Sequence, residues 1–415
     1  MTDLDNNATT KPHPLVIDAM TDAMQHSWHN PSSIHRAGQE ARRKVELARV
    51  QVAALIGVAA KTIVFTSGGT EAIDLALRGA LGAASRGQDS NARRPLNIVT
   101  TPIEHAAVRQ LVDEFADVRS SGPRAELRLC PVQRDGTVEA AAVIDLIDDA
   151  TAAVSVQWCN NETGAIMPVA EIAAACRQRG VPFHCDATQW VGKMPTRISV
   201  ADADPANVGP DSGLCYPDFL NFSAHKFHGP KGVGVLYCRP GTRFVPQLLG
   251  TQEMGRRGGT ENVTGIIGCG VACELAGLWL ASAADRGRLG ALRDRFEHSL
   301  ITSVVRSKCL RDEPVVNGPC DVRRLWNVTN IAFPTLEAEA LLLALSERGI
   351  CASAGAACSS GSLDPSPVLL AMGVPPALAH GSIRFSLSRE STEADVMGAV
   401  ETIAACVQRV AASGM

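Results

Sequence analysis

Strand-like and helix-like segments alternate between residues 40 and 238, and this alternation constrains the fold of the chain more than any other feature. Strands that alternate with helices predict a mostly parallel sheet with helices on both faces. Ligands of such sheets bind beyond the carboxyl ends of the strands. The strand-like segments are 62–67, 96–101, 152–158, 182–188, 218–224 and 233–238, and the helical patterns cover 40–57, 71–80 and 168–180.

The length of the chain predicts two domains, because 415 residues exceed one compact core of ordinary size. From about residue 260 the pattern changes to long helices with fewer strands, which places a second, smaller domain there. Hydrophobic residues make up 46% of the chain, and this content excludes disorder along its whole length. A net charge of -4 gives no overall attraction to nucleic acid or acidic lipid, so an anionic ligand needs a local site.

The stretch 265–284 is apolar enough to be mistaken for a membrane span, but Glu274 lies near its middle. A buried helix is the better interpretation, because a central carboxylate is costly in lipid. The first ten residues are polar and do not have the pattern of a signal peptide. The 13 cysteines are scattered, form no CxxC pair and have no zinc-site spacing. We therefore expect a soluble cytoplasmic protein with reduced thiols and no permanent metal.

A glycine-rich turn after the first predicted strand is a candidate phosphate site. The backbone N–H groups of Gly69 and Thr70, together with the start of the following helix, are suited to hold an anion. A simple helix cap explains the same residues about equally well. Asp186 ends another apolar strand, where it can pair with a buried cation such as a protonated ring nitrogen. Taken alone, Asp186 is more simply an ordinary turn residue.

The segment 221–234 places Lys226 after a strand, close to Ser223 and His225 and before a glycine-rich bend. A lysine held in a pocket loses its proton easily and forms imines with carbonyl compounds. Most lysines are instead solvated on the surface, and we interpret Lys231 in this way. Ser223 and Lys226 also satisfy the S-x-x-K pattern of penicillin-binding proteins. That match is a coincidence of spacing, because no S-D-N or K-T-G sequence follows it.

Two residues of the C-terminal part are candidates for sulfur and carboxylate chemistry. Cys358 lies among small, flexible residues in 353–366, a setting that suits a thiol that must swing. Cys351, in the apolar run just before, is predicted to be a core residue. Arg384 lies in a strand-like segment and can bind a carboxylate through two parallel hydrogen bonds. A structural salt bridge is the simpler alternative for Arg384.

Taken together and in order, these motifs resemble the NifS/IscS type of cysteine desulfurases, which belong to the class V aminotransferase group of enzymes that use pyridoxal 5'-phosphate (PLP). The resemblance extends from Leu4 to about residue 400, and the opening and the short C-terminus are more similar to the NifS branch. The motifs are LDNNATT (4–10), HNPSSIH (29–35), VFTSGGTE (64–71), EHAAV (104–108), NNETG (160–164), HCDATQ (184–189), FSAHKFHGPKGVG (222–234), GRRGGTEN (255–262), SIRFSLSR (382–389) and the loop around Cys358.

The resemblance implies a fold and a domain division. The fold is the PLP-dependent transferase fold, aspartate aminotransferase-like or fold type I. Its large domain, 14–259, has a mostly parallel sheet and binds PLP. The smaller α+β domain comprises 1–13 and 260–415 and carries the loop with the catalytic cysteine.

The resemblance also implies a role for each matching residue. Lys226 bonds to PLP and moves protons, and Cys358 receives the substrate sulfur as a persulfide. Arg384 binds the substrate carboxylate with Asn161 nearby. Thr260 reaches the phosphate of the other subunit in a homodimer. The remaining cofactor contacts are His105 stacking on the ring, Asp186 at its nitrogen, Gln189 at its phenolic oxygen, Asn161 on the same side as Gln189, and Gly69, Thr70, Ser223 and His225 at the phosphate.

The implied activity converts L-cysteine to L-alanine and passes sulfur to an iron–sulfur scaffold protein for cluster assembly, with nitrogen fixation as the implied pathway. Selenocysteine lyase or cysteine sulfinate desulfinase activity is the alternative within the same group. A non-catalytic sulfur carrier is a further alternative, but it has no need of Lys226, Asp186 and the phosphate loop together. Cys358 is also a possible transient ligand of an iron–sulfur cluster. The chain departs from the family in a longer 195–217 loop, best explained as a tolerated insertion, and in having a cysteine at position 351.

Overall fold

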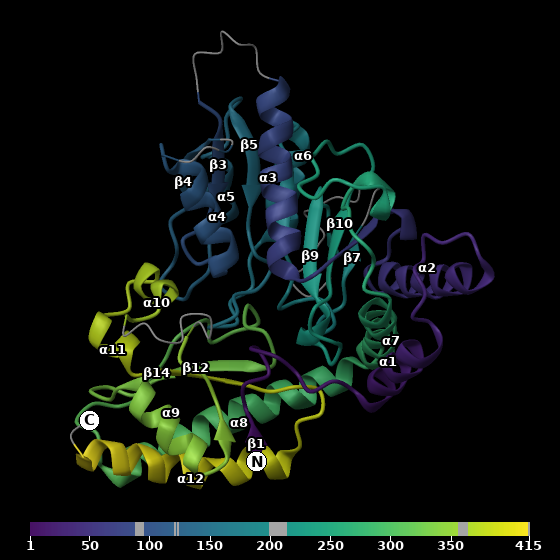
Figure 1. Ribbon diagram of the computed structural model, residues 1–415. Helices are drawn as coiled ribbons and strands as arrows, with labels where there is room; N and C mark the ends of the chain where they lie inside the picture. The colour runs from purple at the N-terminus through teal and green to yellow at the C-terminus, as the bar shows by residue number, and fades with distance from the viewer. Residues whose placement is uncertain (88–94, 120–121, 123, 199–213, 356–363, 414–415) are drawn as a thin grey trace.

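The computed structural model describes residues 1–87, 95–119, 122, 124–198, 214–355 and 364–413. Its centre is a seven-stranded sheet in the order β2-β10-β9-β6-β5-β3-β4, in which only β10 runs antiparallel to its neighbours (Figure 1). The strands are β2 (Ile63–Thr66), β3 (Asn97–Thr100), β4 (Glu126–Leu129), β5 (Thr151–Ser155), β6 (Phe183–Asp186), β9 (Phe219–Ser223) and β10 (Gly234–Cys238).

Helices cover both faces of this sheet, because successive strand residues face opposite sides. Val64, Ile98 and Phe219 join one apolar cluster with α3 (Gly69–Gly87) and α4 (Ala106–Ala116). Their sequence neighbours Val99 and Leu220 join the other cluster, which includes α5 (Ala140–Ile144) and α6 (Val169–Arg179). Near-continuous apolar runs therefore mark strands that are buried on both sides.

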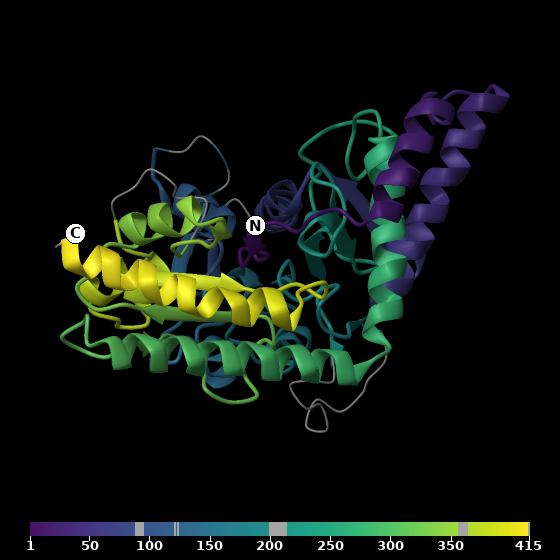
Figure 2. The same cartoon turned by 90° about the horizontal axis from the view of Figure 1, so that it is seen from below.

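A second, three-stranded sheet has the antiparallel order β11-β12-β14. Its strands are β11 (Val315–Val316), β12 (Val328–Ala332) and β14 (Ser382–Ser386). The long helices α8 (Ala283–Ser307) and α12 (Glu393–Ser413) lie side by side along it (Figure 2). The remaining helices of this part are α9 (Ala338–Glu347), α10 (Pro367–Ala371) and α11 (Pro376–His380).

The N-terminal segment runs between the two sheets and contacts both parts of the molecule. Its strand β1 (Thr2–Asp3) pairs with β13 (Ile350–Cys351), and Asp5 forms a bridge to Ser386 of β14. The backbone N–H of Thr10 then donates to the carbonyl oxygen of His225, beyond the end of β9. Residues 2–10 therefore connect the small sheet to the edge of the large sheet where ligands are expected.

Three helices form a bundle that projects from one side of the molecule: α1 (Pro14–His26), α2 (Arg36–Ile56) and α7 (Val263–Leu280) (Figure 2). Among the described residues, α7 is the one helix long and apolar enough to cross a membrane, and half of it is buried. It packs against α1 and α2, as expected for the buried helix predicted over 265–284.

The predicted fold class is confirmed, including the parallel sheet covered on both faces.

Two predictions need correction. Cys351 is half-buried rather than a core residue, because it lies in the two-residue strand β13. The ends of the predicted 195–217 loop are not irregular: Arg197–Ile198 and Leu214–Cys215 form a short parallel pair, β7 and β8. Residues 199–213 between them lie outside the described part of the chain. The division at residues 13/14 and 259/260 stays a prediction.

Candidate active site

A cavity of about 410 Å³ opens beyond the carboxyl ends of β6 and β9, where the sheet topology predicts a ligand. This volume is in the range of small-molecule and cofactor sites. Residues from both sheets line it, and they come from segments as far apart as Asn7 and Arg384. The predicted site residues on its wall are Gly69, Thr70, His105, Asn161, Asp186, Gln189, Ser223, His225, Lys226 and Arg384.

The start of α3 forms one end of the cavity. Because α3 begins at Gly69, its first N–H groups have no partner within the helix and face the cavity. The N–H of Gly69 donates to Ser223 Oγ at 2.9 Å, and a side-chain carbon at position 69 would lie only 2.8 Å from the same oxygen. The backbone of the turn therefore approaches Ser223 closely, and this end of the cavity is suited to bind a phosphate.

Asp186 lies at another part of the wall and is held by a chain of buried polar side chains. Its Oδ1 accepts from Asn221 Nδ2 at 2.9 Å and from the backbone N–H of Thr188 at 3.0 Å. Asn221 Oδ1 lies 2.8 Å from His184 Nε2, and His184 Nδ1 lies 2.8 Å from Ser155 Oγ. Because Asn221 presents its amide nitrogen to the carboxylate, its oxygen accepts from the Nε2–H of His184. This chain fixes the orientation of Asp186.

Burial lowers the pKa of His184 to about 4, so this imidazole is neutral at pH 7. The chain behind Asp186 therefore carries no positive charge of its own. A cation that enters the cavity is the partner that the carboxylate lacks. A protonated pyridine nitrogen has this property.

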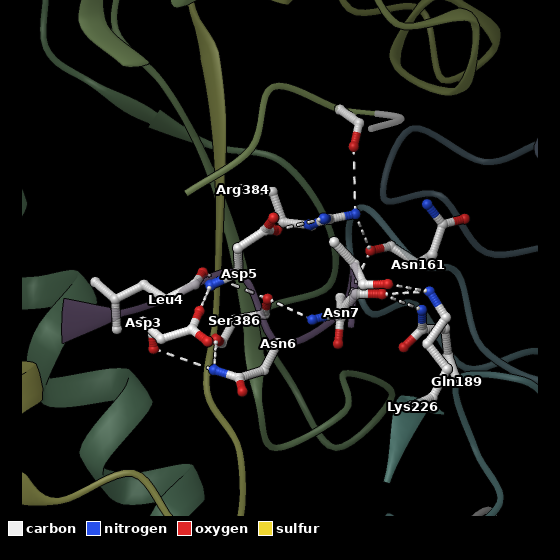
Figure 3. A network of polar contacts seen from close by, with 12 residues as sticks. Asp3, Leu4, Asp5, Asn6, Asn7, Asn161, Gln189, Lys226, Arg384 and Ser386 are labelled. Carbon is white, nitrogen blue, oxygen red and sulfur yellow. Dashed lines mark hydrogen bonds and ion pairs between the residues drawn. The ribbon is translucent and has the colours of Figure 1, made fainter. Parts of the chain in front are cut away.

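Lys226 ends the short helix η4 (Ala224–Lys226), which follows β9 directly. Its Nζ donates to the carbonyl oxygens of Asn7 and Ala8, both at 2.8 Å (Figure 3). The N-terminal segment thus holds the amine in the cavity, beside Gln189, whose Nε2 donates to the same Asn7 oxygen at 3.0 Å. Gln189 keeps a second N–H for a ligand, in agreement with its predicted contact to a ring oxygen.

The histidines on the wall have different surroundings. His105 caps α4 by accepting the N–H of Ala107 through Nδ1 at 3.1 Å, which fixes its ring at the cavity. His225 lies 3.2 Å from Thr9 Oγ1 through its Nδ1. Burial and the nearby charges of Lys226 and Lys231 lower the pKa of His225 to about 4. His225 can therefore donate a hydrogen bond to a phosphate but adds no charge.

Arg384 reaches the cavity from β14 of the small sheet and is almost fully buried. Its Nη2 pairs with Asp5 Oδ1 at 2.8 Å, and its Nη1 donates to the carbonyl oxygens of Asn161 at 3.2 Å and Gly355 at 3.3 Å (Figure 3). Its Nε is buried without a hydrogen-bond partner in the described part of the chain. The guanidinium is held rigidly at the cavity wall, where its positive charge can attract a carboxylate.

Two predicted residues are not among the described residues of the cavity wall. Thr260 is exposed and is not on the cavity wall of this chain. Cys358 lies outside the described residues. The predictions for both residues therefore stay open.

Several residues that contribute to the site were not predicted: Asn7, His184, Lys193 and Asn221. A usable signal was present for two of them, since His184 and Asn221 are polar residues within apolar strands and buried polar groups need partners. Asn7 and Lys193 carry no signal of this kind, because neither lies within an apolar strand and they contact each other across 186 positions.

The residues of the cavity fit PLP. A helix N-terminus for a phosphate, a carboxylate for a ring nitrogen, a lysine for an aldehyde and an arginine for a substrate carboxylate all face one space. Together with the sheet topology, this arrangement defines a PLP-dependent enzyme of fold type I.

The chain belongs to the aminotransferase class-V family, whose model matches residues 3–398. It is 41% identical to a cysteine desulfurase of Enterobacter agglomerans over 98% of this chain and 92% of the relative. It is 43% identical to a cysteine desulfurase of Bradyrhizobium diazoefficiens over 99% and 95% of the two chains.

Solved structures agree with this assignment. One described as a NifS-like protein is 32% identical to this chain and covers 98% of it, with 99% of its own chain aligned and a TM-score of 0.80. Another, SspA in complex with cysteine, is 27% identical with a TM-score of 0.72, and the alignment covers 94% of this chain and all of the other. The predicted family and its cofactor, PLP, are confirmed.

Proposed function

We propose that this protein is a PLP-dependent cysteine desulfurase, which converts L-cysteine to L-alanine and keeps the sulfur on Cys358. One observation carries the proposal: Lys226, just after β9 of the large sheet, and Arg384 of the small sheet line the same cavity. An amino acid whose carboxylate is bound by Arg384 therefore presents its Cα toward Lys226. The cysteine desulfurases to which the chain is 41–43% identical along nearly its whole length support cysteine as the amino acid.

Different residues of this chain contribute to the first step, the removal of the proton from Cα of the amino acid. PLP, when bound, withdraws electrons from Cα of the amino acid. Asp186 holds the ring nitrogen protonated, and Gly69, Thr70 and Ser223 hold the phosphate. Lys226 Nζ takes the proton from Cα and later returns a proton to the product. Because the amine is fixed by two carbonyl oxygens, little reorganisation is needed for this transfer.

The sulfur leaves by attack of the Cys358 thiolate on the sulfur of the bound cysteine. The new S–S bond forms as the C–S bond of the substrate breaks, so the products are a Cys358 persulfide and, after proton uptake, alanine. No external oxidant or reductant is needed, because the substrate carbon is reduced as its sulfur is oxidised to the persulfide level.

The activity is tested by the visible absorbance of the purified protein and by alanine formation from L-cysteine. Lys226→Ala should lose the absorbance band of bound PLP. Cys358→Ala should keep that band and lose sulfur transfer. Parallel assays with selenocysteine and cysteine sulfinate measure substrate preference. Faster turnover of either compound than of cysteine would instead favour the related lyase or desulfinase activity.

Partners and compartment are part of the same proposal. We propose a cytoplasmic homodimer that passes sulfur to an iron–sulfur scaffold protein, with nitrogen fixation as its pathway. Large apolar side chains support an interface on and next to the projecting helices: Met24, Trp28, Ile34, Leu47, Val50, Leu248 and Leu249 are exposed. Thr260 is also exposed and follows Leu249 by eleven residues, so a partner that covers this face can receive Thr260 in its own site.

A further inference from the structure

Lys193 is a buried amine next to the site that the reaction outlined above does not use. It follows Gln189 by four residues, and only 5% of the residue is exposed. Its Nζ donates to Gln189 Oε1 at 2.6 Å and to Asn7 Oδ1 at 2.7 Å. Both partners are neutral, and across the described ranges no carboxylate pairs with this amine. A buried lysine without a counter-ion is costly, which indicates a function beyond packing.

Asn7 links this amine to both halves of the site. The side-chain oxygen Oδ1 of Asn7 also accepts from Asn327 at 2.9 Å, and its Nδ2 donates to the carbonyl oxygen of Asn161 at 3.1 Å. The backbone carbonyl oxygen of Asn7 accepts from both Gln189 and Lys226. Its backbone N–H donates to Ser386 Oγ at 2.8 Å. Asn7 therefore connects Lys193, through its side chain, to the backbone carbonyl that holds Lys226, and Figure 3 shows the contacts of that carbonyl with Lys226 and Gln189.

We propose that Lys193 is a positioning residue for the Lys226 nitrogen and for Gln189, and that its charge opposes a second positive charge at Lys226. This inference rests on the proposed function only in that it assumes PLP bound to Lys226. It applies to whichever amino acid the enzyme takes.

The electrostatics of the cluster agree with this role. Burial lowers the pKa of Lys193 to about 7, with smaller contributions from the charges of Lys226 and Arg384, while Cys159 acts in the opposite direction. Interaction between two charges is mutual, so a charged Lys193 disfavours a proton on Lys226 as much as the reverse. The effect keeps the Lys226 nitrogen able to accept a proton near neutral pH.

The test is a pH titration of the visible absorbance of the holoenzyme between pH 5 and 9, without substrate. Lys193→Met has a side chain of similar length but no charge and no donor. Because Lys193 carries its charge only near and below pH 7, the curve of Lys193→Met should be shifted toward the protonated form between pH 5 and 7 and should coincide with that of the unchanged protein above pH 8. Lys61→Met, which changes an exposed lysine that does not line the cavity, is the matched control and should leave the whole curve unchanged.

Asn7→Ser provides a second variant if Lys193→Met does not fold. It removes one of the two acceptors of Lys193 but keeps the backbone carbonyl that holds Lys226, so a smaller shift in the same direction is expected. Superimposable titration curves for the variant and the unchanged protein, including two flat curves, would overturn the inference. A failure of the proposed function is seen separately, as an unchanged protein that binds PLP but forms no alanine from cysteine.

Discussion

Among single residues, Arg384 gives the clearest expectation for substrate binding. Arg384→Lys keeps the charge but loses the planar pair of N–H groups and the contacts with Asp5 and Asn161. Hydrogen bonds to charged groups contribute about 1.5–3 kcal/mol, so kcat/KM for cysteine should fall about 10- to 100-fold, mainly through KM. Steady-state kinetics measure this change.

The matched control is Arg295→Lys, which alters an exposed arginine on α8. It should leave both kinetic constants unchanged. If Arg384→Lys had the same KM as the unchanged protein, Arg384 would be a purely structural partner of Asp5. That outcome would favour the simpler interpretation of Arg384 from the sequence, a structural salt bridge.

Residue types and motif order were sufficient to predict ten residues that line one cavity, including Lys226 and Asp186. The connections behind them were not predictable. Asn7 contacts Lys193 across 186 positions and Asn327 across 320, and no local pattern encodes pairs so distant. The prediction for Cys351 is wrong because its apolar run forms β13, a two-residue strand that is only partly buried.

At the level of structural elements, the turn from β2 into α3 should bind the phosphate of PLP. Gly69→Ala places a carbon 2.8 Å from Ser223 Oγ, so the turn and Ser223 must move apart. We expect PLP affinity to fall about tenfold, the loss of roughly one hydrogen bond to a charged group. Absorbance titration of the protein with PLP measures this affinity.

Gly277→Ala on α7 is the control, because open space surrounds that position. Alanine should be neutral or slightly stabilising there and should leave PLP affinity unchanged. Unchanged affinity in Gly69→Ala as well would show that the start of α3 does not contact the phosphate.

Glu104, between β3 and α4, connects two strands of the sheet through a buried carboxyl group. Its Oε1 accepts from Thr101 Oγ1 and from the N–H of Gln157, and burial raises its pKa to about 8. Between pH 4.5 and 8 the unfolded chain loses this proton while the folded protein keeps it, so the folded state binds more protons. The contribution of Glu104 to stability therefore falls as the pH rises through this window, by about 1.4 kcal/mol per unit.

Glu104→Gln keeps the shape and remains neutral, so it should remove this loss. In thermal unfolding at several pH values, the free energy of unfolding of the variant should rise relative to that of the unchanged protein from pH 5 to pH 8. Above pH 8 the difference between the two free energies should be constant. Parallel curves would mean that Glu104 is ionised in the folded protein.

Six strands of the large sheet follow the predicted segments, because strands buried on both faces give continuous apolar runs. Among the helices of residues 36–179, α2 and α6 follow the predictions, α3 is longer than predicted, and α4 and α5 were missed. The strand β4 was missed, since its residues are exposed or half-buried and it lies at the edge of the sheet. The pair β7–β8 was missed because two-residue strands within a polar loop carry no periodic signal.

At the scale of the whole molecule, the proposed dimer should place Thr260 of one subunit in the site of the other. Thr260→Ala and Lys226→Ala should each be weakly active or inactive alone. Mixed dimers should contain one intact site, with Lys226 from one chain and Thr260 from the other, and recover about one quarter of the full activity.

Refolding or co-expression of the two variants, followed by an alanine assay, measures this recovery. Activity no higher than the average of the two separate variants would show that each site is built from a single chain. The second, three-stranded sheet lies entirely after the change of pattern near residue 260, while the division into two domains stays a prediction. The course of residues 2–10 between both sheets was not predictable, because it depends on contacts that form only in the folded molecule.

The most direct test of the central claim follows sulfur from L-cysteine to Cys358. The PLP-loaded protein is mixed with one equivalent of L-cysteine, alanine is quantified, and the peptide that contains Cys358 is analysed by mass spectrometry. We predict one alanine for each sulfur atom gained by that peptide, and neither product with Lys226→Ala. Alanine formation at an undiminished rate in Cys358→Ala, or no alanine from the unchanged protein, would contradict the account.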